Sequence, residues 1–435
     1  MYLVYSILLA LGLGAMAPLL WLRNSPDGRY TRFLGERFGR LAPLAGGAGG
    51  QQGAIWLHAV SVGEALAVER LIAQLKLRFP QRPVVLSVTT ATGRAVATRR
   101  IACDRIFYFP LDFRFAARRA LSAHRPALVL IAETEIWPNF LMEAELAGVP
   151  VMFLNGRISG RSYARYRLIR KLLRPTLGRA SAFLMQTRTD AERICELGAE
   201  AARVQVAGNL KFDLVPPEQP RFLAQIRAGL ARAGIRQIVV AGSTMAEEEA
   251  MLLSIWGRLG NPERLLVLAP RHPQRFAAVA ALLGASGLAW TQRSRWEGGE
   301  AALEAGGVLL LDSLGELASA YELATVAFVG GSLEPHGGHN LLEPAYWGVP
   351  VTFGPHMENF AAIAEQFLAA GAAHSAASQL ELEHIWRRLL DDEGERVRVG
   401  AAARALLESQ RGATTRALDA IAALLPADAS VQSGM

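Results

Sequence analysis

The chain has 435 residues, which is too long for one ordinary hydrophobic core and predicts two domains with additional elements. Hydrophobic residues make up 51% of the chain and charged residues 20%, which is a globular composition, and the formal net charge is +7. The two cysteines, Cys103 and Cys195, lie in no CxxC or Cys/His ligand spacing. The sequence therefore argues against a disulfide framework and against a zinc site.

The first 22 residues hold an apolar surplus and carry no charged side chain. Their length matches the ~20 apolar residues that cross a bilayer as a helix, so residues 1–22 are predicted to form a transmembrane anchor. A cleaved signal peptide is the weaker alternative, because no basic residue precedes the apolar run. Five arginines follow, from Arg23 to Arg40, and the positive-inside rule then places the rest of the chain in the cytoplasm.

Strand-like and helix-like segments alternate from residue 54 onward. Buried strands are predicted, in chain order, for AIWLHAV, PVVLSV, ALVLIAE and PVMFLN, and helices for SVGEALAVERLIAQLKLRF and EIWPNFLMEAELAG. Alternation of this kind predicts parallel strands joined by crossover helices. Residues 23–212 are therefore predicted to form a first α/β, Rossmann-like domain.

Three prolines cluster between residues 216 and 220, where the periodicity fails, so residues 213–220 are predicted to form an interdomain linker. A second α/β series predicts another Rossmann-like domain over residues 221–425, and residues 426–435 are predicted to be a disordered tail. Two such domains imply a central cleft, and ligands of parallel sheets bind beyond the carboxyl ends of the strands.

A basic block runs from residue 156 to residue 189, with eight arginines, one lysine and no acidic residue. A solvated helix face would normally include carboxylates four residues from the basic side chains, so their absence favours an anionic partner. Phosphorylated lipid or an anionic membrane surface fits the neighbouring anchor better than nucleic acid does. The block supplies candidate contacts to a phosphorylated ligand at Arg157, Arg161 and Arg165.

Glu64 follows the strand AIWLHAV at the start of a helix, where its carboxylate could accept a proton from a substrate hydroxyl. Ser61 and Glu64 also form the S-x-x-E capping box, which gives the same residue a purely structural role. The spacing alone favours the cap and does not decide between the two interpretations.

Glu133 and Glu135 lie at the carboxyl end of strand ALVLI, where groups that face the cleft are expected. Two carboxylates this close predict either a raised pKa on one of them or a shared cationic partner, although glutamates at helix starts are also common. Lys211 lies at the domain junction, where its ammonium suits a phosphate or carboxylate of a donor. An exposed linker lysine is the alternative interpretation.

Candidate phosphate contacts also follow strands in the second domain. Ser243 lies in a turn between a strand and a helix, where backbone N–H groups can hold a phosphate. Arg271 and His272 follow the strand RLLVL, and an arginine there can pair bidentately with phosphate.

The strongest local feature of the second domain is VGGSLEPHGGHNLLEPAYWG, whose glycines allow a ligand to approach closely. Asn340 and Glu343 begin a helix at the end of this loop. Upstream, Ser313 and Glu316 form another capping box in the segment DSLGE. No DxD sequence occurs, which removes the usual carboxylate clamp for a metal-bridged nucleotide and makes metal-free transfer the simpler expectation.

Taken in order, these motifs resemble one known family. The chain is similar to the 3-deoxy-D-manno-octulosonic acid (Kdo) transferases of Gram-negative bacteria in the segments RYTRFLGERFG, WLHAVSVGE, VTTATG, AETEIWPN, LNGRIS, GNLKFD, AGST, APRHP and GGSLEPHGGHNLLEPA. The resemblance extends from the N-terminal anchor to about residue 370. It implies a GT-B glycosyltransferase of family 30, with the acceptor domain first and the CMP-sugar donor domain second.

The resemblance implies inverting transfer of Kdo from CMP-Kdo to the lipid A precursor (lipid IVA) in lipopolysaccharide biosynthesis, at the cytoplasmic face of the cell inner membrane. It implies no cofactor, no metal and no nucleic-acid partner, since CMP-Kdo is a substrate. By position, Glu64 would be the general base, and Glu133 and Lys211 would stabilise the transition state. The resemblance assigns CMP contacts to Arg271, His272, Leu314, Gly315, Glu316, Asn340, Leu341, Leu342 and Glu343. Candidate acceptor or phosphate contacts remain Glu135, Arg157, Arg161, Arg165 and Ser243.

Two other functions fit the predicted fold and charge. One is a GT-B transferase that uses a UDP-sugar and another membrane lipid, and a comparison of CMP with UDP as stabilising ligands would distinguish it. The other is a non-catalytic, membrane-tethered lipid-binding protein, which would show no turnover.

Overall fold

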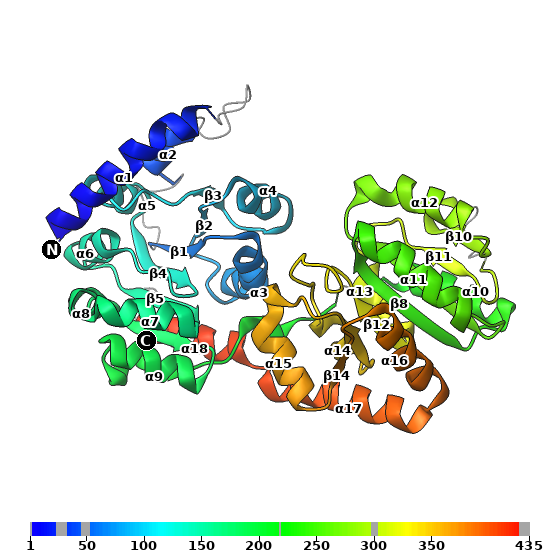
Figure 1. Cartoon of the computed structure of the whole chain (residues 1–435). Coiled ribbons are helices and arrows are strands. Elements are labelled where there is room, and N and C mark those ends of the chain that lie inside the picture. Colours follow the sequence, from blue (N-terminus) through cyan, green and yellow to red (C-terminus); the bar gives the residue numbers. More distant parts are fainter. Residues whose placement is uncertain (1, 23–32, 45–52, 217–218, 297–302, 426–435) are drawn as a thin grey trace, which may run out of the picture. The chain divides into compact units, whose positions relative to one another are not determined.

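The computed structural model describes residues 2–22, 33–44, 53–216, 219–296 and 303–425. The chain divides into two compact units, of which unit 1 comprises Met1–Asp213 and Arg411–Met435, and unit 2 comprises Leu214–Gln410 (Figure 1). The predicted tail at residues 426–435 lies outside the described residues, and so do the first three arginines of the positive-inside argument.

Unit 1 has, within the described ranges, a seven-stranded parallel sheet with the strand order β3-β2-β1-β4-β5-β6-β7. The strands are β1 (Ala54–Ala59), β2 (Val84–Val88), β3 (Arg105–Tyr108), β4 (Pro126–Ala132), β5 (Val151–Gly156), β6 (Ala182–Met185) and β7 (Val204–Val206). The helices are α1 (Tyr2–Leu22), α2 (Leu34–Arg37), α3 (Val62–Arg78), α4 (Ala91–Arg100), α5 (Arg114–His124), α6 (Pro138–Leu146), α7 (Gly160–Leu168), α8 (Arg170–Leu177), α9 (Arg188–Leu197) and α18 (Ala413–Leu424).

Alternating side chains of β1 divide the core of unit 1 between the two faces of the sheet. Ile55, Leu57 and Ala59 pack in one apolar cluster, whereas Trp56 packs in the cluster on the opposite face. The indole Nε1 of Trp56 donates to Ser87 Oγ at 2.8 Å, so the polar atom of this buried side chain is hydrogen-bonded. Because apolar clusters cover both faces, the whole of β1 is buried, which confirms the strand predicted for AIWLHAV.

Unit 2 repeats this plan with a second seven-stranded parallel sheet over its described residues, in the order β10-β11-β9-β8-β12-β13-β14. The strands are β8 (Gln237–Thr244), β9 (Arg264–Pro270), β10 (Trp290–Gln292), β11 (Val308–Leu310), β12 (Val326–Val329), β13 (Val351–Phe353) and β14 (Ala373–Ser375). The helices are α10 (Pro220–Ala233), α11 (Ala246–Leu259), α12 (Phe276–Ala285), α13 (Leu317–Ala320), α14 (Leu342–Tyr346), α15 (Ala361–Ala369), α16 (Gln379–Asp391) and α17 (Glu393–Gln410). Two parallel α/β units of the Rossmann-like kind are therefore present, as predicted.

The C-terminal helix departs from the predicted domain boundary. Residues 221–425 were expected to form one domain, but unit 2 ends at Gln410 and α18 belongs to unit 1. The apolar side of α18, represented by Ala417 and Ile421, packs into the same cluster as α3. Helical periodicity predicts that such a face is buried, but it does not say against which unit.

The apolar N-terminal segment is helical, since Tyr2–Leu22 forms α1. One side of α1 is hydrogen-bonded to the rest of unit 1, where Asn139 Nδ2 of α6 donates to Ser6 Oγ at 2.9 Å and Arg179 Nε donates to the Tyr2 hydroxyl at 3.0 Å. Over the described part of the chain, no helix combines the length and the apolar character needed to cross a membrane, which differs from the transmembrane helix predicted for residues 1–22.

Asp213 attaches the start of α18 to the rest of unit 1. Its side chain is only 6% exposed, and its carboxylate accepts hydrogen bonds from the backbone N–H of Gly412 at 2.7 Å and of Thr414 at 2.5 Å. Arg70 donates to the backbone carbonyl of the same aspartate. The buried carboxylate thus accepts from the N-cap residue Gly412 and from Thr414 in the first turn of α18, which has no partner within the helix for that N–H.

Replacing Asp213 by alanine is expected to lower the free energy of unfolding by ~2–3 kcal/mol, because two buried N–H donors lose a charged acceptor. Urea denaturation followed by circular dichroism measures this loss. The matched control is Asp419→Ala, which removes an exposed partner of Arg78 from the same helix and should change stability by less than ~1 kcal/mol. Equal losses in the two variants would contradict the role of Asp213.

Candidate active site

Glu64 lies in the first turn of α3, directly after β1, and is partly exposed. Its Oε2 accepts from the backbone N–H of Val60 at 2.8 Å and its Oε1 from Ser61 Oγ at 2.9 Å, while Ser61 Oγ accepts from Glu64 N–H at 3.3 Å. The capping interaction predicted from the S-x-x-E spacing is therefore present. Each carboxylate oxygen keeps a second lone pair, so the cap holds Glu64 in one orientation and leaves it able to accept a proton.

Glu133 lies at the carboxyl end of β4 in an uncommon backbone conformation, with φ of +56° in the left-handed region. Its N–H donates to the carbonyl of Leu154 at 2.8 Å, so this turn is anchored to β5. Burial raises the pKa of the Glu133 carboxyl and the negative charge of Glu64 raises it further, whereas Lys211 and Arg157 counteract the shift. Glu133 therefore belongs to one electrostatic group with these three residues.

Glu135 joins the same group. Burial raises the pKa of its carboxyl, and the charges of Glu64 and Glu133 add to that effect. Burial raises the pKa of the Tyr166 hydroxyl and the charge of Glu135 adds to that effect, so α7 comes within electrostatic reach of Glu135. A pocket of about 270 Å³ on α7 and the start of α8 is lined by Ser162, Arg165, Tyr166 and Ile169.

Lys211 lies in the 3-10 turn Leu210–Asp213. Burial lowers the pKa of its ammonium, Glu133 and Glu64 counteract that change, and Arg157 adds to it. The structure therefore brings together the candidate base and both residues that were expected to stabilise the transition state.

Asn155, within the motif LNGRIS, is a positioning residue that was not among the predicted site residues. It is 4% exposed and has φ of +53°. Its Oδ1 accepts from Leu210 N–H at 3.0 Å, and its carbonyl accepts from Gln186 Nε2 at 3.0 Å. Asn209 links Gln186 to the backbone of Lys211 through bonds of 3.2 and 3.0 Å. A polar residue at the end of a buried strand was the available signal.

The basic block divides into two parts in the structure. Arg157 is tied to the Glu133–Glu135 turn, because Thr134 Oγ1 donates to its carbonyl at 2.8 Å and accepts from its N–H at 3.0 Å. Arg161 and Arg165 lie farther along the chain on α7 and are exposed, and of the two Arg165 lines the pocket. Arg157 therefore acts electrostatically on Glu133, whereas Arg161 and Arg165 form part of the α7 surface.

In unit 2 the predicted phosphate contacts lie at the carboxyl ends of β8 and β9. Ser243 has φ of +57°, also in the left-handed region. The backbone N–H of Arg271 donates to the carbonyl of Thr244 at 3.0 Å, which joins the two strand ends, and both Arg271 and His272 are exposed. Their side chains are accessible to an anionic ligand.

The remaining predicted nucleotide contacts differ in accessibility. Leu314 is 77% exposed and Gly315 has φ of +86°, whereas the Glu316 carboxylate is held by two hydrogen bonds from Arg293 at 2.8 and 2.9 Å. No group of three or more His, Cys, Asp or Glu side chains placed to bind a metal ion is found among the residues that the structure describes.

The segment from Asn340 to Glu343 begins α14. Asn340 Oδ1 accepts from Leu342 N–H at 3.1 Å, and its Nδ2 donates to Glu343 Oε1 at 3.2 Å. Leu341 and Leu342 are fully buried, so their side chains belong to the core. Only their backbone groups are left to contact a nucleotide.

The two units thus carry complementary chemistry at their strand ends. Unit 1 holds carboxylates that can accept a proton beside the cationic Lys211 and Arg157, and unit 2 holds exposed Arg271 and His272 beside backbone suited to phosphate. Proton acceptance from a hydroxyl and binding of a nucleotide phosphate are the requirements of a glycosyltransferase that uses a nucleotide sugar.

Comparisons with known proteins agree with this class. The family described as 3-Deoxy-D-manno-octulosonic-acid transferase (kdotransferase) matches residues 32–214. The 3-deoxy-D-manno-octulosonic acid transferase of Bordetella pertussis is 38% identical over 437 residues, covering 94% of this chain and 97% of that protein. The enzyme of the same name from Haemophilus influenzae is 34% identical over 397 residues, covering 90% and 91%.

The glycotransferase of kitacinnamycin has a similar fold, with a TM-score of 0.52 and 17% identity, over 87% of this chain and 100% of that one. This likeness supports the fold of two Rossmann-like units, and the named relatives show that the chain is a glycosyltransferase. On the identity to the two curated relatives, it belongs to the family of 3-deoxy-D-manno-octulosonic acid transferases.

The pKa of Lys211 should be measurable directly, because the chain contains only three lysines, Lys76, Lys171 and Lys211. Acetylation at a series of pH values, quantified by mass spectrometry against free Nα-acetyl-lysine, should give Lys211 a midpoint below the ordinary lysine value. Glu133→Gln should lower the midpoint further, because it removes a negative charge that raises the pKa of Lys211.

The control for this measurement is Glu135→Gln, because Glu135 is not among the groups that shift the pKa of Lys211. Its effect on the Lys211 midpoint should be smaller than that of Glu133→Gln. An unchanged or higher midpoint in the Glu133 variant would show that the two side chains are not electrostatically coupled.

Proposed function

We propose that the chain transfers Kdo from CMP-Kdo to the lipid A precursor, with inversion at the anomeric carbon, at the cytoplasmic face of the inner membrane. The curated relatives are named for the transfer of 3-deoxy-D-manno-octulosonic acid, which supports the sugar. The observation that carries the proposal is the charged group of unit 1, formed by Glu64, Glu133, Glu135, Lys211 and Arg157.

In this mechanism Glu64 is the general base. Its carboxylate accepts the proton of the acceptor hydroxyl while the hydroxyl oxygen bonds to the anomeric carbon and the bond to the CMP phosphate breaks. Hydrogen bonds from Val60 and Ser61 fix the orientation of the carboxylate before the reaction. Lys211 stabilises negative charge in the transition state, and Glu133 supports its protonated form by raising the pKa of the ammonium.

The donor nucleotide is assigned to unit 2 in this proposal. Arg271 and His272 bind the phosphate as it leaves, and backbone N–H groups near Ser243 add to the binding of its negative charge. The start of α14 at Asn340 and Glu343 contacts the nucleoside. We also propose that transfer needs no metal, because these side chains supply positive charge and the sequence contains no DxD motif.

Replacing Glu64 by glutamine is expected to lower turnover by at least ~10²-fold, because an amide cannot accept the hydroxyl proton. Purified protein incubated with CMP-Kdo and lipid A precursor, followed by mass spectrometry of the lipid, measures the turnover. Stability should change by less than ~1 kcal/mol, because glutamine also serves at the third position of a capping box.

The matched control for Glu64→Gln is Ser61→Ala, which removes the cap hydroxyl and keeps the carboxylate. It should lower stability by ~1 kcal/mol and retain most of the turnover. Near-normal transfer by a folded Glu64→Gln variant would refute the role of Glu64 as general base and leave it only the role of capping α3. Thermal stabilisation of the wild type by UDP and not by CMP would instead favour the UDP-sugar transferase.

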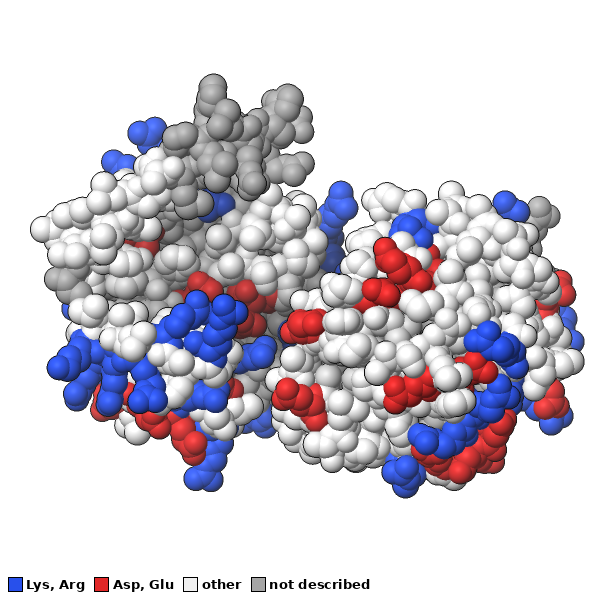
Figure 2. Space-filling model, viewed as in Figure 1, with Lys and Arg blue, Asp and Glu red and all other residues white. Residues whose placement is uncertain are grey.

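Membrane attachment is part of the proposal and is supported by the α7–α8 surface. This surface combines the exposed apolar side chains of Leu168, Ile169 and Leu172 with exposed basic side chains. Figure 2 shows Lys and Arg gathered over α7 and α8. The basic residues are Arg161, Arg165, Arg167, Arg170, Lys171 and Arg174. Apolar side chains among cations suit the interface of an anionic membrane.

Helix α1 extends this lipid-binding region. Its Tyr2 hydroxyl is hydrogen-bonded to Arg179, just beyond the end of α8. Further along the described part of α1, large apolar side chains are exposed at Leu3, Val4, Ile7, Leu8 and Leu11. We propose that these apolar side chains of α1 contact the membrane surface, while the α7–α8 surface contacts phospholipid headgroups and the phosphates of the acceptor.

Charge reversal on the α7–α8 surface should weaken binding to anionic vesicles. Changing Arg167, Arg170 and Lys171 to glutamate should lower partitioning into phosphatidylglycerol vesicles by at least ~10-fold, since each basic side chain near such a surface contributes ~1 kcal/mol. Co-sedimentation of the full chain measures the partitioning, and the difference should shrink at high salt.

The control for this charge reversal is a triple variant of unit 2. It changes three exposed arginines to glutamate, namely Arg236, Arg387 and Arg398. This variant undergoes the same change of net charge and should keep most of its vesicle binding. Equal loss in both triple variants would show that net charge, and not the α7–α8 surface, determines attachment.

A further inference from the structure

Glu248 lies in the first turn of α11 and is fully buried. Its Oε2 accepts hydrogen bonds from the backbone N–H of Met245 at 2.9 Å and of Gly331 at 2.7 Å. Its Oε1 accepts from the backbone N–H of Ser332 at 2.8 Å and of Leu333 at 3.0 Å. Four N–H groups and the positive end of the α11 dipole thus stabilise the charge of this buried carboxylate.

Three of these donors begin the glycine-rich loop between β12 and α14. The loop is fixed at further points, since Gly338 N–H donates to the carbonyl of Gly331 at 2.7 Å and His356 N–H to the carbonyl of Ser332 at 2.9 Å. Gly354 N–H also donates to Ser332 Oγ at 2.8 Å, which joins the loop to the end of β13. Glu248 therefore holds the start of the segment that leads to Asn340 and Glu343.

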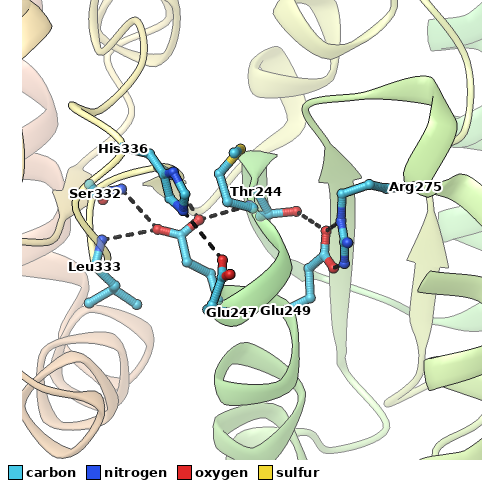
Figure 3. A network of polar contacts seen from close by, with 10 residues as sticks. Thr244, Glu247, Glu249, Arg275, Ser332, Leu333 and His336 are labelled. Atoms are coloured by element: carbon cyan, nitrogen blue, oxygen red, sulfur yellow. Dashed lines mark hydrogen bonds and ion pairs between the residues drawn. The ribbon is translucent and has the colours of Figure 1, made fainter. Parts of the chain in front are cut away.

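The two neighbouring glutamates extend the same arrangement (Figure 3). Glu247 Oε2 lies 3.3 Å from His336 Nε2, within the glycine-rich loop. Glu249 is fully buried and is paired with Arg275, in the segment that follows Arg271 and His272. The first turn of α11 thus contacts both segments that are assigned to the donor.

The loop that Glu248 holds also supports His339, a residue of the glycine-rich motif to which the sequence assigned no role. A Cβ atom at Gly331 would lie 3.0 Å from both Cδ2 and Nε2 of His339, so the imidazole packs directly on this backbone. Burial, together with the nearby Arg271, His272 and His336, lowers the pKa of His339 to about 4, which keeps the imidazole neutral at neutral pH. Its Nε2 is buried and has no hydrogen-bond partner among the described residues.

A purely architectural role would require only that Glu248 accept hydrogen bonds from N–H groups of the loop that have no other partner. The connection from Glu248 through Gly331 to His339, and from there to Arg271 and His272, adds a functional consequence. A shift of residues 331–333 would change the position of the imidazole that packs on them, and with it the electrostatic interaction with the two exposed side chains.

We propose that Glu248 is a positioning residue of the donor site, which holds residues 331–333 so that His339, Arg271 and His272 together bind the phosphate of the nucleotide sugar. This inference rests on the proposed assignment of the donor to unit 2. His339 contributes a neutral N–H donor, and the exposed side chains contribute charge.

The test compares wild type with Glu248→Gln, in which an NH₂ group is brought against backbone N–H donors that the carboxylate had bound. The Kd of CMP by calorimetry and the KM of CMP-Kdo should each rise by at least ~10-fold. The KM of the lipid acceptor should stay within ~2-fold, because the acceptor groups lie in unit 1. Unchanged CMP affinity in a folded Glu248→Gln variant overturns the proposal.

The matched control is Glu383→Gln, at another buried carboxylate of unit 2, which is paired with Arg258 and Arg387 and contacts neither donor segment. It should lower thermal stability without changing the Kd of CMP. An equal rise of the Kd in both variants would make the effect general destabilisation and would also overturn the proposal.

A double-mutant cycle with His339→Ala distinguishes positioning from a separate structural effect. If Glu248 acts through His339, the Kd of CMP for the double variant should be about that of the single variant with the higher Kd. Additive losses of binding free energy would contradict the connection. Should Glu248→Gln not fold, Glu248→Asp keeps the charge, shortens the reach and takes its place in the cycle. Failure of the wild type itself to bind CMP would refute the assignment of the donor, and not the role of Glu248.

Discussion

Burial of both faces of each parallel sheet is the constraint on which the arrangement of functional groups depends. Apolar clusters lie on the two sides of the sheet in each unit, so ionised side chains gather where the strands end. In unit 1 the strand ends carry Glu64 after β1 and Glu133 after β4. In unit 2 they carry Ser243 in β8 and Arg271 after β9. Both sets of candidate residues thus follow from the same packing.

The charged group of unit 1 is a balance between burial and mutual interaction. Burial raises the pKa of Glu133 and Glu135 and lowers that of Lys211, so each group is driven towards its neutral form. The attraction between Glu133 and Lys211 opposes the pKa shift of each of these two groups. Groups in this balance respond to small changes in neighbouring charge, which is the property required where a proton is transferred.

Local pattern predicted the elements well because periodicity reports burial within one segment. The strands AIWLHAV and PVVLSV formed as β1 and β2, and the S-x-x-E spacing at Glu64 formed the predicted cap. For Glu133 and Glu135 the sequence offered a raised pKa or a shared cation, and the structure shows raised pKa values for both, with Lys211 acting on Glu133. Short strands such as β10 and β14 were missed, because three residues carry little periodicity.

By itself, the sequence determined the two α/β units, the family and the residues at strand ends, because these depend on side-chain type and on spacing along the chain. Only the tertiary structure decided that α18 packs in unit 1, that Arg157 is coupled to Glu133, and that Glu248 binds the loop at residues 331–333. These contacts join residues far apart in sequence, since Gly331 follows Glu248 by 83 positions. A glutamate in a helical first turn has the same local pattern whether its carboxylate faces water or a distant loop.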